Sequence, residues 1–516
     1  MKKRWICIVL LLLFLCGCSA DVLPVGLNME QGQAGETGDG QGEEGVQMHP
    51  KTMSLVYFDG ESLNPLNTQS TTNFALKYLY CDPLIALDEN QQPMPGLVHT
   101  WEIEQNVVTL SLTEGVYFHD GTPFAARHVE ENINYVMQTV TSPYYALREK
   151  IATVRARNER TVEIVLKEAD YGFFALLNMP IVKIPGGDSL PIGTGRYFFE
   201  QEDGQLLLKQ NEAWYGNQLG LISQIILKSY PDREAVSFAF SSGDIDLLHT
   251  AAILPDQQGF YGSAREQYYI NTNVTFLSVN MENEILSTQV RSGLNQLVDR
   301  ARLTNARITP VFTPLYPGWW ALPRQTEQTA YITQTQREQM LQELGFVDLN
   351  GDGIFDKPDG TSLDALVLLA NGDNEEKSET ALRIADQLRT MGFPIEIVTP
   401  SFEEYAQRLT HGQFDLALCE IKLDSSMNVA PLVLADGQIN YGGYAPLTLV
   451  PEMEAMQRAS SQEAYQQAAA SLYDMLLKEV PVISLFYKTE AVLVQENIGW
   501  DIQPTANDVF INIEKW

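Results

Sequence analysis

Apolar and polar residues follow one another in short runs along this chain, and the period of each run predicts an element. In the first half, alternation at every second position predicts strands at 54–58, 107–112, 161–166 and 205–210. A helical period predicts helices at 71–79, where threonines can cap the first turn, and at 125–139. Residues 107–112 and 116–119 precede the turn-forming pair Asp120-Gly121, so we expect them to form an antiparallel ribbon.

The second half of the chain alternates strands with longer helices. Helices are predicted at 289–298, 335–344, 376–391, 402–410 and 463–478. Strands are predicted between them at 363–369, 395–398 and 414–418. Alternation of this kind is typical of an α/β unit, in which helices cover a mainly parallel sheet.

The composition indicates a large folded protein with an acidic surface. At roughly 150 residues per unit, the 516 residues suffice for about three globular units, and 45% of them are apolar. The 34 basic residues against 66 acidic ones leave a formal net charge of −32 with histidine neutral. Nucleic acid requires a basic surface, so this charge argues against a nucleic acid partner.

The amino terminus has the pattern of an export signal. Lys2, Lys3 and Arg4 precede an apolar run at 5–15, which is shorter than a membrane span. The run ends in Leu15-Cys16-Gly17-Cys18, which resembles the bacterial lipobox. We therefore expect residues 1–17 to be a signal peptide and Cys18 to carry the lipid that anchors the protein on the extracytoplasmic face of the cell membrane. An ordinary cleaved signal peptide and an uncleaved anchor remain alternatives.

A linker and two further cysteines complete this overview. Residues 31–45 contain no large apolar side chain, so 18–50 is expected to be a flexible tether and the folded body to begin near Lys51. Cys81 and Cys419 are the only cysteines in the body. They form either one disulfide bridge or two buried free thiols.

Several motifs resemble a known family. Tyr80-Cys-Asp-Pro-Leu-Ile-Ala-Leu87, Pro95-Gly-Leu-Val-His-Thr-Trp101 and Gly115-Val-Tyr-Phe-His-Asp-Gly121 look like the signature of the oligopeptide- and dipeptide-binding proteins, solute-binding family 5. Gly193-Thr-Gly-Arg-Tyr197 and Val480-Pro-Val-Ile-Ser-Leu485 keep the family order. The resemblance extends from about residue 54 to residue 516 and identifies the chain as an extracytoplasmic receptor of an ABC importer.

This resemblance implies a fold, a mechanism and partners. The fold is α/β, of the two-lobed periplasmic-binding-protein type (type II, cluster C), with an extra small subdomain in the first lobe. Lobe one would comprise 51–270 and 481–516, with the subdomain at about 76–189, and lobe two 274–480. The chain would cross between them near 268–273 and 479–484, and the lobes would close on a ligand. Permease and ATPase subunits are the implied partners, and no cofactor is implied.

The family also suggests a ligand-binding carboxylate. In peptide-binding members, an aspartate nine residues after that of a Phe-Asp strand pairs with the free amino group of the peptide. Counting from Asp415 leads here to Asp424, although Ile421 and Ser425 replace the flanking aromatic residues. Such a pair makes strong charge-assisted hydrogen bonds. The alternative is that Asp424 is a solvated loop residue.

Four aromatic residues are further candidates for ligand contacts. Tyr441 and Tyr444 are spaced by glycines that can leave ring faces open to a cleft, and Trp319 and Trp320 follow a Pro-Gly turn and can wall a pocket. Core packing is the alternative for each of them.

An acidic segment has the spacing of a calcium loop. Its candidate oxygen ligands occupy positions one, three, five, nine and twelve, and they are Asp348, Asn350, Asp352, Asp356 and Asp359. The last ligand is aspartate instead of glutamate, and a strand instead of a helix is predicted to follow. The family often carries a similar turn without metal, so we expect no metal here.

No catalytic motif is found. The sequence contains no Gly-x-Ser-x-Gly, no H-E-x-x-H and no glycine-rich phosphate loop, and its six histidines are scattered. We therefore expect a binding protein and not an enzyme, most consistent with capture of short peptides for import. The alternatives are a non-peptide solute, such as a nickel chelate, haem or an oligosaccharide, and a peptide sensor that signals without transport.

Overall fold

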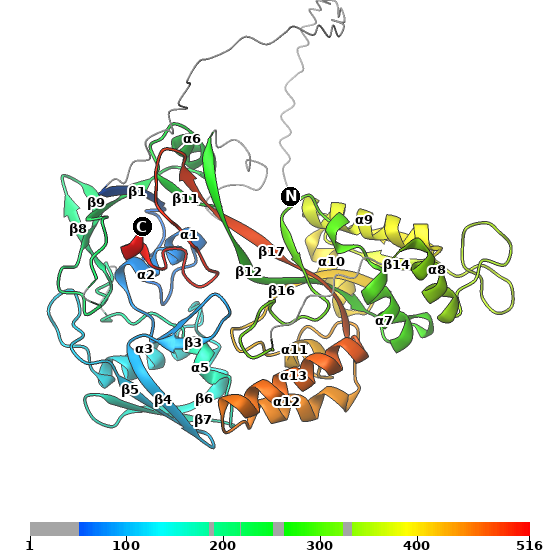
Figure 1. The fold of residues 1–516 in the computed structure, drawn as a ribbon, viewed down its shortest axis with the longest axis horizontal. Coiled ribbons are helices and arrows are strands. Elements are labelled where there is room, and N and C mark those ends of the chain that lie inside the picture. Colours follow the sequence, from blue (N-terminus) through cyan, green and yellow to red (C-terminus); the bar gives the residue numbers. More distant parts are fainter. Residues whose placement is uncertain (1–50, 185–189, 217, 251–262, 324–332) are drawn as a thin grey trace, which may run out of the picture. The chain divides into compact units, whose positions relative to one another are not determined.

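Two long strands, β12 (Ala264–Val279) and β17 (Val482–Gln495), pair antiparallel through the middle of the fold (Figure 1). The pairing register shifts between Ile270 and Val274 and again between Thr275 and Phe276. The computed structural model describes residues 51–184, 190–216, 218–250, 263–323 and 333–516. The predicted signal peptide, Cys18 and the linker lie outside these residues. The chain divides into two units, 1–46 and 47–516, and the second holds every element described below.

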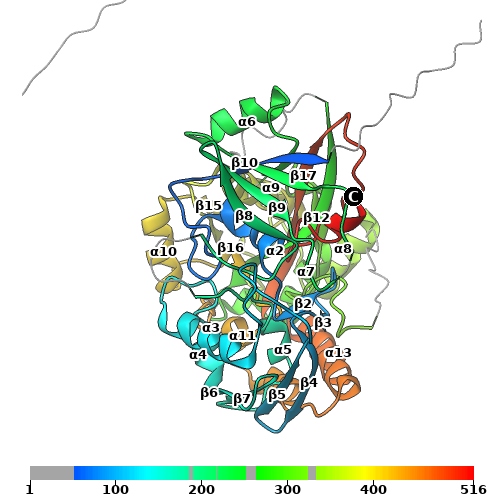
Figure 2. The ribbon, with the colours of Figure 1, turned by 90° about the vertical axis from the view of Figure 1, so that its left-hand side faces the viewer.

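Two four-stranded sheets precede β12. One has the order β1-β10-β9-β8, with β1 parallel to β10 (Figure 2), and the other the order β4-β5-β7-β6. Their strands are β1 (Thr52–Tyr57), β4 (Val98–Glu104), β5 (Val107–Leu112), β6 (Ile151–Ala156), β7 (Thr161–Leu166), β8 (Tyr197–Glu202), β9 (Gln205–Gln210) and β10 (Gln224–Ser229). A small pair joins β2 (Ile85–Leu87) to β3 (Pro93–Pro95).

Short helices accompany these sheets. They are α1 (Thr71–Ala75), α2 (Lys77–Tyr80), α3 (Ala126–Gln138), α4 (Leu147–Lys150), α5 (Phe173–Leu176) and α6 (Arg233–Ser241). The predicted helix at 71–79 is divided at Leu76, and Ser70 caps it by accepting a hydrogen bond from the Asn73 N–H. The prediction for 125–139 is confirmed by α3.

The predicted ribbon of 107–112 with 116–119 is wrong. Strand β5 pairs with β4 on one edge and with β7 on the other, so residues 116–119 cannot join it and make a single bridge from Tyr117 to Pro123. The pattern did not reveal β4 because a register shift between Val98 and Thr100 breaks the alternation at its start, so that only Trp101 and Ile103 alternate with polar residues.

The third sheet contains β12 and β17 and has the order β11-β17-β12-β16-β14-β15, with β13 also pairing with β17. Its shorter strands are β11 (Leu247–His249), β13 (Ile308–Pro310), β14 (Leu366–Leu369), β15 (Ile395–Val398) and β16 (Leu416–Lys422). Only β14 is parallel to its neighbours, β15 and β16, and all other pairs are antiparallel. The expectation of a mainly parallel sheet is therefore wrong, because the two long strands enter it from outside the strand–helix alternation.

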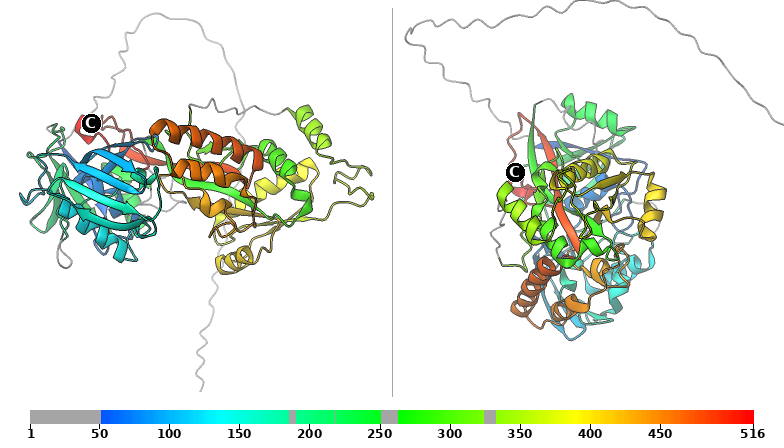
Figure 3. Two further views of the ribbon diagram at one scale, coloured as in Figure 1. Left: turned by 90° about the horizontal axis from the view of Figure 1, so that it is seen from below. Right: turned by 90° about the vertical axis from the view of Figure 1, so that its right-hand side faces the viewer.

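The helices of the second half match their predictions to within one residue at each end. They are α7 (Thr288–Leu297), α8 (Gln334–Glu343), α9 (Glu375–Met391), α10 (Phe402–Thr410) and α13 (Gln462–Glu479). Two more, α11 (Ala430–Val433) and α12 (Val450–Gln457), were not predicted. Helices α12 and α13 pack side by side, in orange to red in Figure 3. Among the described residues, no helix has the length and apolar character needed to cross a membrane.

The buried apolar residues form separate cores. Two clusters draw on residues up to Tyr269 and from Ala491 onward. Two others draw on residues from Val274 to Tyr487. The long strands thus pass from one group of cores to the other, β12 between Tyr269 and Val274 and β17 between Tyr487 and Ala491.

Candidate ligand-binding site

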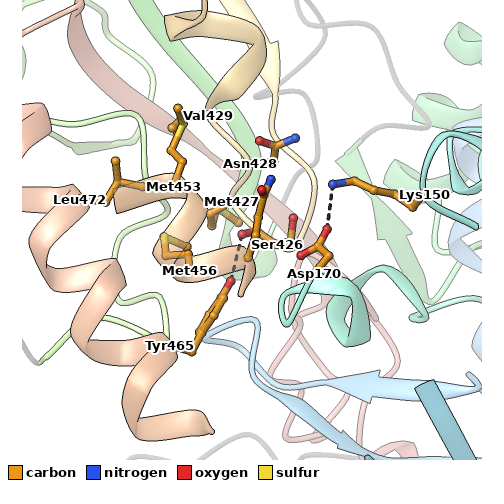
Figure 4. A pocket seen from close by; sticks show the side chains of 11 residues that line it. Lys150, Asp170, Ser426, Met427, Asn428, Val429, Met453, Met456, Tyr465 and Leu472 are labelled. Carbon is orange, nitrogen blue, oxygen red and sulfur yellow. Dashed lines mark hydrogen bonds and ion pairs between the residues drawn. The ribbon is translucent and has the colours of Figure 1, made fainter. Parts of the chain in front are cut away.

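Two small pockets lie where residues of the first 270 positions meet residues of 274–480, and they share Tyr465 of α13. The first is shown in Figure 4. Lys150 and Asp170 come from the first part of the chain, and the turn Ser426–Val429 faces them from the second. Met453, Met456 and Leu472 give this pocket an apolar wall. A polar mouth over an apolar wall is typical of sites for small ligands.

Asp424 begins the turn at this first pocket. Its carboxylate accepts hydrogen bonds from the backbone N–H groups of Ser426, at 3.0 Å, and Asn428, at 3.4 Å, and from the Ser426 hydroxyl. The side chain is exposed. The protein around it removes enough water to raise the pKa of the carboxyl, while the Ser426 bonds, the Asn428 bond and the charge of Lys150 act in the opposite direction. Asp424 is therefore an accessible carboxylate held by its own turn.

The Lys150–Asp170 ion pair faces this turn. Lys150 Nζ lies 2.7 Å from Asp170 Oδ2, and both side chains are largely covered. Tyr465 donates to the Ser426 carbonyl at 3.4 Å. Burial raises the pKa of Tyr465 well above its usual value, and the charges of Asp170 and Asp424 add to this effect. The tyrosine thus stays a neutral donor between the two carboxylates.

The second pocket is aromatic and has no charged side chain in its lining. Trp320 stacks on Tyr465 with 5.5 Å between ring centroids, and Tyr171 lies 5.2 Å from the same ring. Trp101 and Ser425 complete two of its walls. The structure thus brings the predicted Trp320 next to the residue that follows Asp424.

The other predicted aromatic residues lie deeper. Trp319 and Tyr444 are each 1% exposed and belong to one core cluster, and Trp319 packs edge-on against Tyr465. Tyr441 is half-buried against the same cluster. Trp319 thus packs behind Tyr465, Tyr441 and Tyr444 pack with the core, and among the predicted aromatic residues only Trp320 lines either pocket.

A polar cluster lies where β12 and β17 change cores. Glu490 accepts hydrogen bonds from the Tyr269 hydroxyl at 2.6 Å and from Asn271 Nδ2 at 3.1 Å. Burial alone would raise the pKa of Glu490, but hydrogen bonds from His249, Tyr269 and Asn271 outweigh it and lower the pKa to about 2. An ionised carboxylate therefore ties the two strands together beside the register shift.

The candidate calcium loop is closed by its own hydrogen bonds. Asp348 accepts from the N–H groups of Gly351 and Gly353, and Asp356, which is 7% exposed, accepts from that of Leu349. Asn350 and Asp352 accept from backbone N–H groups two residues ahead, as does Asp359. In the described part of the chain, no group of three or more acidic, histidine or cysteine side chains is placed to hold a metal ion.

Both body cysteines are buried free thiols, so the structure decides between the two alternatives left open for them. Burial raises the pKa of Cys81 and Cys419. Cys18 lies outside the described residues.

Sequence reasoning missed Lys150, Asp170, Tyr171 and Tyr465. Tyr465 is one of several residues on the buried face of α13, and no local pattern distinguishes it. Asp170-Tyr171-Gly172 could more easily have been identified as part of a site, because a polar, an aromatic and a glycine residue follow closely after the predicted strand at 161–166.

Comparison with known proteins assigns this arrangement to a family. The family described as bacterial extracellular solute-binding proteins, family 5 (middle region), matches residues 92–438. Oligopeptide-binding protein AppA of Bacillus subtilis is 22% identical over 444 residues, covering 79% of this chain and 80% of AppA. The nickel-binding periplasmic protein of Escherichia coli is 27% identical over 204 residues, covering 36% of this chain and 38% of its own.

Solved structures show the same fold. A nickel ABC transporter protein from Bacillus halodurans superimposes with a TM-score of 0.74 at 18% identity, covering 89% of this chain and 98% of its own. MppA, a periplasmic murein tripeptide-binding protein in its unliganded open form, gives a TM-score of 0.73 at 16% identity, and the superposition covers 87% of this chain and 94% of MppA. The family match covers more than half of the chain. The chain therefore belongs to the family 5 bacterial extracellular solute-binding proteins and has their two-lobed α/β fold.

Proposed function

We propose that this protein captures a short peptide between its two lobes and delivers it to the permease and ATPase subunits of an ABC importer. Membership of a family of solute-binding proteins supports capture without chemistry, and the relative AppA is named an oligopeptide-binding protein. The observation that carries the peptide assignment is the exposed, turn-held carboxylate of Asp424 beside a pocket lined by both parts of the chain.

The lobe boundaries belong to this proposal. The sequence assigns lobe one to 51–270 and 481–516, with the subdomain at 76–189, and lobe two to 274–480. The separation of the cores supports the first crossing near 268–273. It favours a return crossing between Tyr487 and Ala491, because residues 482–487 pack in the same cores as lobe two, so we assign this segment to lobe two. Bending at the register shift of β12 would then open and close the lobes.

Asp424 would hold the amino group of the peptide. One of its oxygens already accepts hydrogen bonds from its own turn, so an ammonium group would add charge-assisted bonds to a carboxylate that cannot swing away. Trp320 would contact the peptide, and Trp319, Tyr441 and Tyr444 would not, because they line neither pocket. Lys150 stands near the carboxylate and repels an ammonium, which restricts where that group can sit.

The proposal also places the protein outside the cytoplasm, anchored to the membrane through a lipid on Cys18. Two acyl chains suffice for stable anchoring, and each buried methylene contributes about 0.8 kcal/mol. Delivery to a membrane permease would then occur within the reach of the 18–50 linker.

A thermal-shift screen with di- to pentapeptides tests this function. We expect free peptides to raise the melting temperature, and the same peptides with acetylated amino termini to raise it much less. Asp424→Asn keeps the size of the side chain but removes its charge, and it should weaken binding of free peptides by about tenfold or more, since charge-assisted bonds contribute about 1.5–3 kcal/mol. If no peptide stabilises the protein, the peptide assignment is wrong.

A nickel chelate is the second candidate, because the relative with 27% identity is named a nickel-binding protein. The same screen with nickel(II) and histidine decides between the two. Stabilisation by the complex and not by peptides would favour the chelate. A transport assay with a labelled peptide in cells with and without this protein would separate import from signalling.

A further inference from the structure

The two proposed lobes also bond to each other directly, away from the strands β12 and β17. The Tyr171 N–H donates to the Gln457 carbonyl at 2.9 Å, and the Trp320 N–H donates to the Asn90 carbonyl at 3.0 Å. Asn90 lies in the turn between β2 and β3, Tyr171 stands before α5, and Gln457 ends α12. Two backbone hydrogen bonds thus join two turns of lobe one to lobe two.

Aromatic packing reinforces these bonds. Tyr465 of lobe two is 2% exposed, and the rings around it include Trp320 from its own lobe and Tyr171 from the other. Separation of the lobes would return the face of Tyr465 that meets Tyr171 to water, and aromatic contact favours the joined state beyond area burial alone.

Gly172 shows how close the approach is. A Cβ atom built on it would lie 2.9 Å from the Tyr465 hydroxyl and 3.1 Å from Ser426 Cβ, both in lobe two. The backbone at Gly172 has φ −68° and ψ −11°, which any residue adopts. Glycine is therefore needed here for the space between the lobes and not for its conformation.

The contacting turns of lobe one are fixed in advance. Asp88 Oδ1 accepts the N–H groups of Asn90 and Gln92, both at 2.8 Å. Asp170, which is 7% exposed, is held by Lys150 directly before Tyr171. Joining the lobes at these points therefore costs little ordering of the chain.

We propose that these residues form a latch, consisting of Asn90, Tyr171 and Gly172 in lobe one and Trp320, Gln457 and Tyr465 in lobe two, which stabilises the closed state and slows release of the bound solute. The inference rests on the proposed opening and closing of the lobes. A ligand that binds the closed state gains apparent affinity in proportion to the closed fraction. By raising the closed fraction, the latch residues would keep the solute bound for longer.

Hydrogen exchange with Gly172→Leu tests the latch in the full chain without added peptide. The new side chain would wedge the lobes apart at one contact, so the amide of Trp320, which belongs to the other contact, should exchange about tenfold faster or more. Gly60→Leu is the matched control, because a Cβ at Gly60 meets nothing within 4 Å, and it should leave Trp320 unchanged. Unchanged Trp320 exchange in Gly172→Leu would overturn the latch.

A second variant disturbs the other contact of the latch, between Asn90 and Trp320. Asp88→Ala releases the Asn90 turn and should speed exchange of the Tyr171 amide, and it serves if Gly172→Leu does not fold. With the tetrapeptide Ala-Ala-Ala-Ala as probe, both variants should raise the dissociation rate constant and leave the association rate constant within about twofold, since the latch acts after encounter. If both variants speed amide exchange as expected but the native protein binds no peptide, the peptide function is wrong and the latch stands. If the native protein binds the peptide and the variants change neither amide exchange nor the dissociation rate constant, the latch alone is wrong.

Discussion

At the scale of single residues, Asp82 shows how burial makes one carboxyl sensitive to pH. It is 4% exposed and accepts hydrogen bonds from Thr194 Oγ1 at 2.8 Å and Trp214 Nε1 at 3.3 Å. Burial raises its pKa from 3.8 to about 6, although the charge of Arg196 and both hydrogen bonds oppose this. The folded state thus binds the proton more tightly than the unfolded chain. The resulting stability is full below about pH 4 and is lost as pH rises through 6.

We predict that Asp82→Asn removes this dependence. A shift of about two units corresponds to about 3 kcal/mol, so the free energy of unfolding of the native protein should fall by up to about that amount between pH 4 and pH 7, and that of the variant should change much less. Urea unfolding at both pH values measures the difference. Asp352→Asn, in an exposed loop, is the control. An equal pH dependence in Asp82→Asn and the native protein would contradict the prediction.

At the scale of elements, helix ends explain why the helices of the second half were predictable. Helix α9 starts with Asn374, whose side chain accepts from the Lys377 N–H, and ends at Gly392 with φ 107°. Gly345 follows α8 with φ 87°. The two glycines differ in the room available for a side chain. A Cβ on Gly392 would lie 2.9 Å from the Phe355 ring, whereas one on Gly345 would meet nothing within 4 Å.

Alanine at these two glycines separates backbone strain from steric contact. Gly345→Ala should lower the free energy of unfolding by about 1–2 kcal/mol through the left-handed backbone alone. Gly392→Ala should lower it further, by about 1–3 kcal/mol more, because Phe355 must shift within a packed core. Urea unfolding of both variants measures the difference, and equal losses would show that Phe355 accommodates the methyl group.

At the scale of the whole molecule, the proposed lipid anchor would determine where in the cell the two lobes bind their ligand. We predict that Cys18→Ala moves the protein from the membrane fraction to the soluble extracytoplasmic fraction without changing peptide binding by the body. Cell fractionation and the mass of the native amino terminus measure this. A native protein that is already soluble and begins at another residue would show an ordinary signal peptide instead of a lipid anchor.

The periodic elements could be predicted, and the candidate site could be predicted only in part. Strands such as 161–166 and helices such as 402–410 alternate or repeat over their whole length, so the local pattern suffices. The pairing of β5 with β4 could not be predicted, because the register shift between Val98 and Thr100 breaks the alternation of β4 at its start. Asp424 was reached by family spacing, and Lys150, whose charge acts on it, was not, since 274 positions separate them.

By itself, the sequence determined the family and most of the element pattern, because both are encoded in neighbouring residues or in spaced motifs, and the export signal stays a prediction. Only the tertiary structure decided that Cys81 and Cys419 are free, that the large sheet is mixed, and that Trp319 and Tyr444 face a core while Trp320 faces a pocket. It also decided that Tyr171 meets Tyr465. Contacts between distant residues depend on how preformed elements pack, and packing is set by shape and burial across the whole fold.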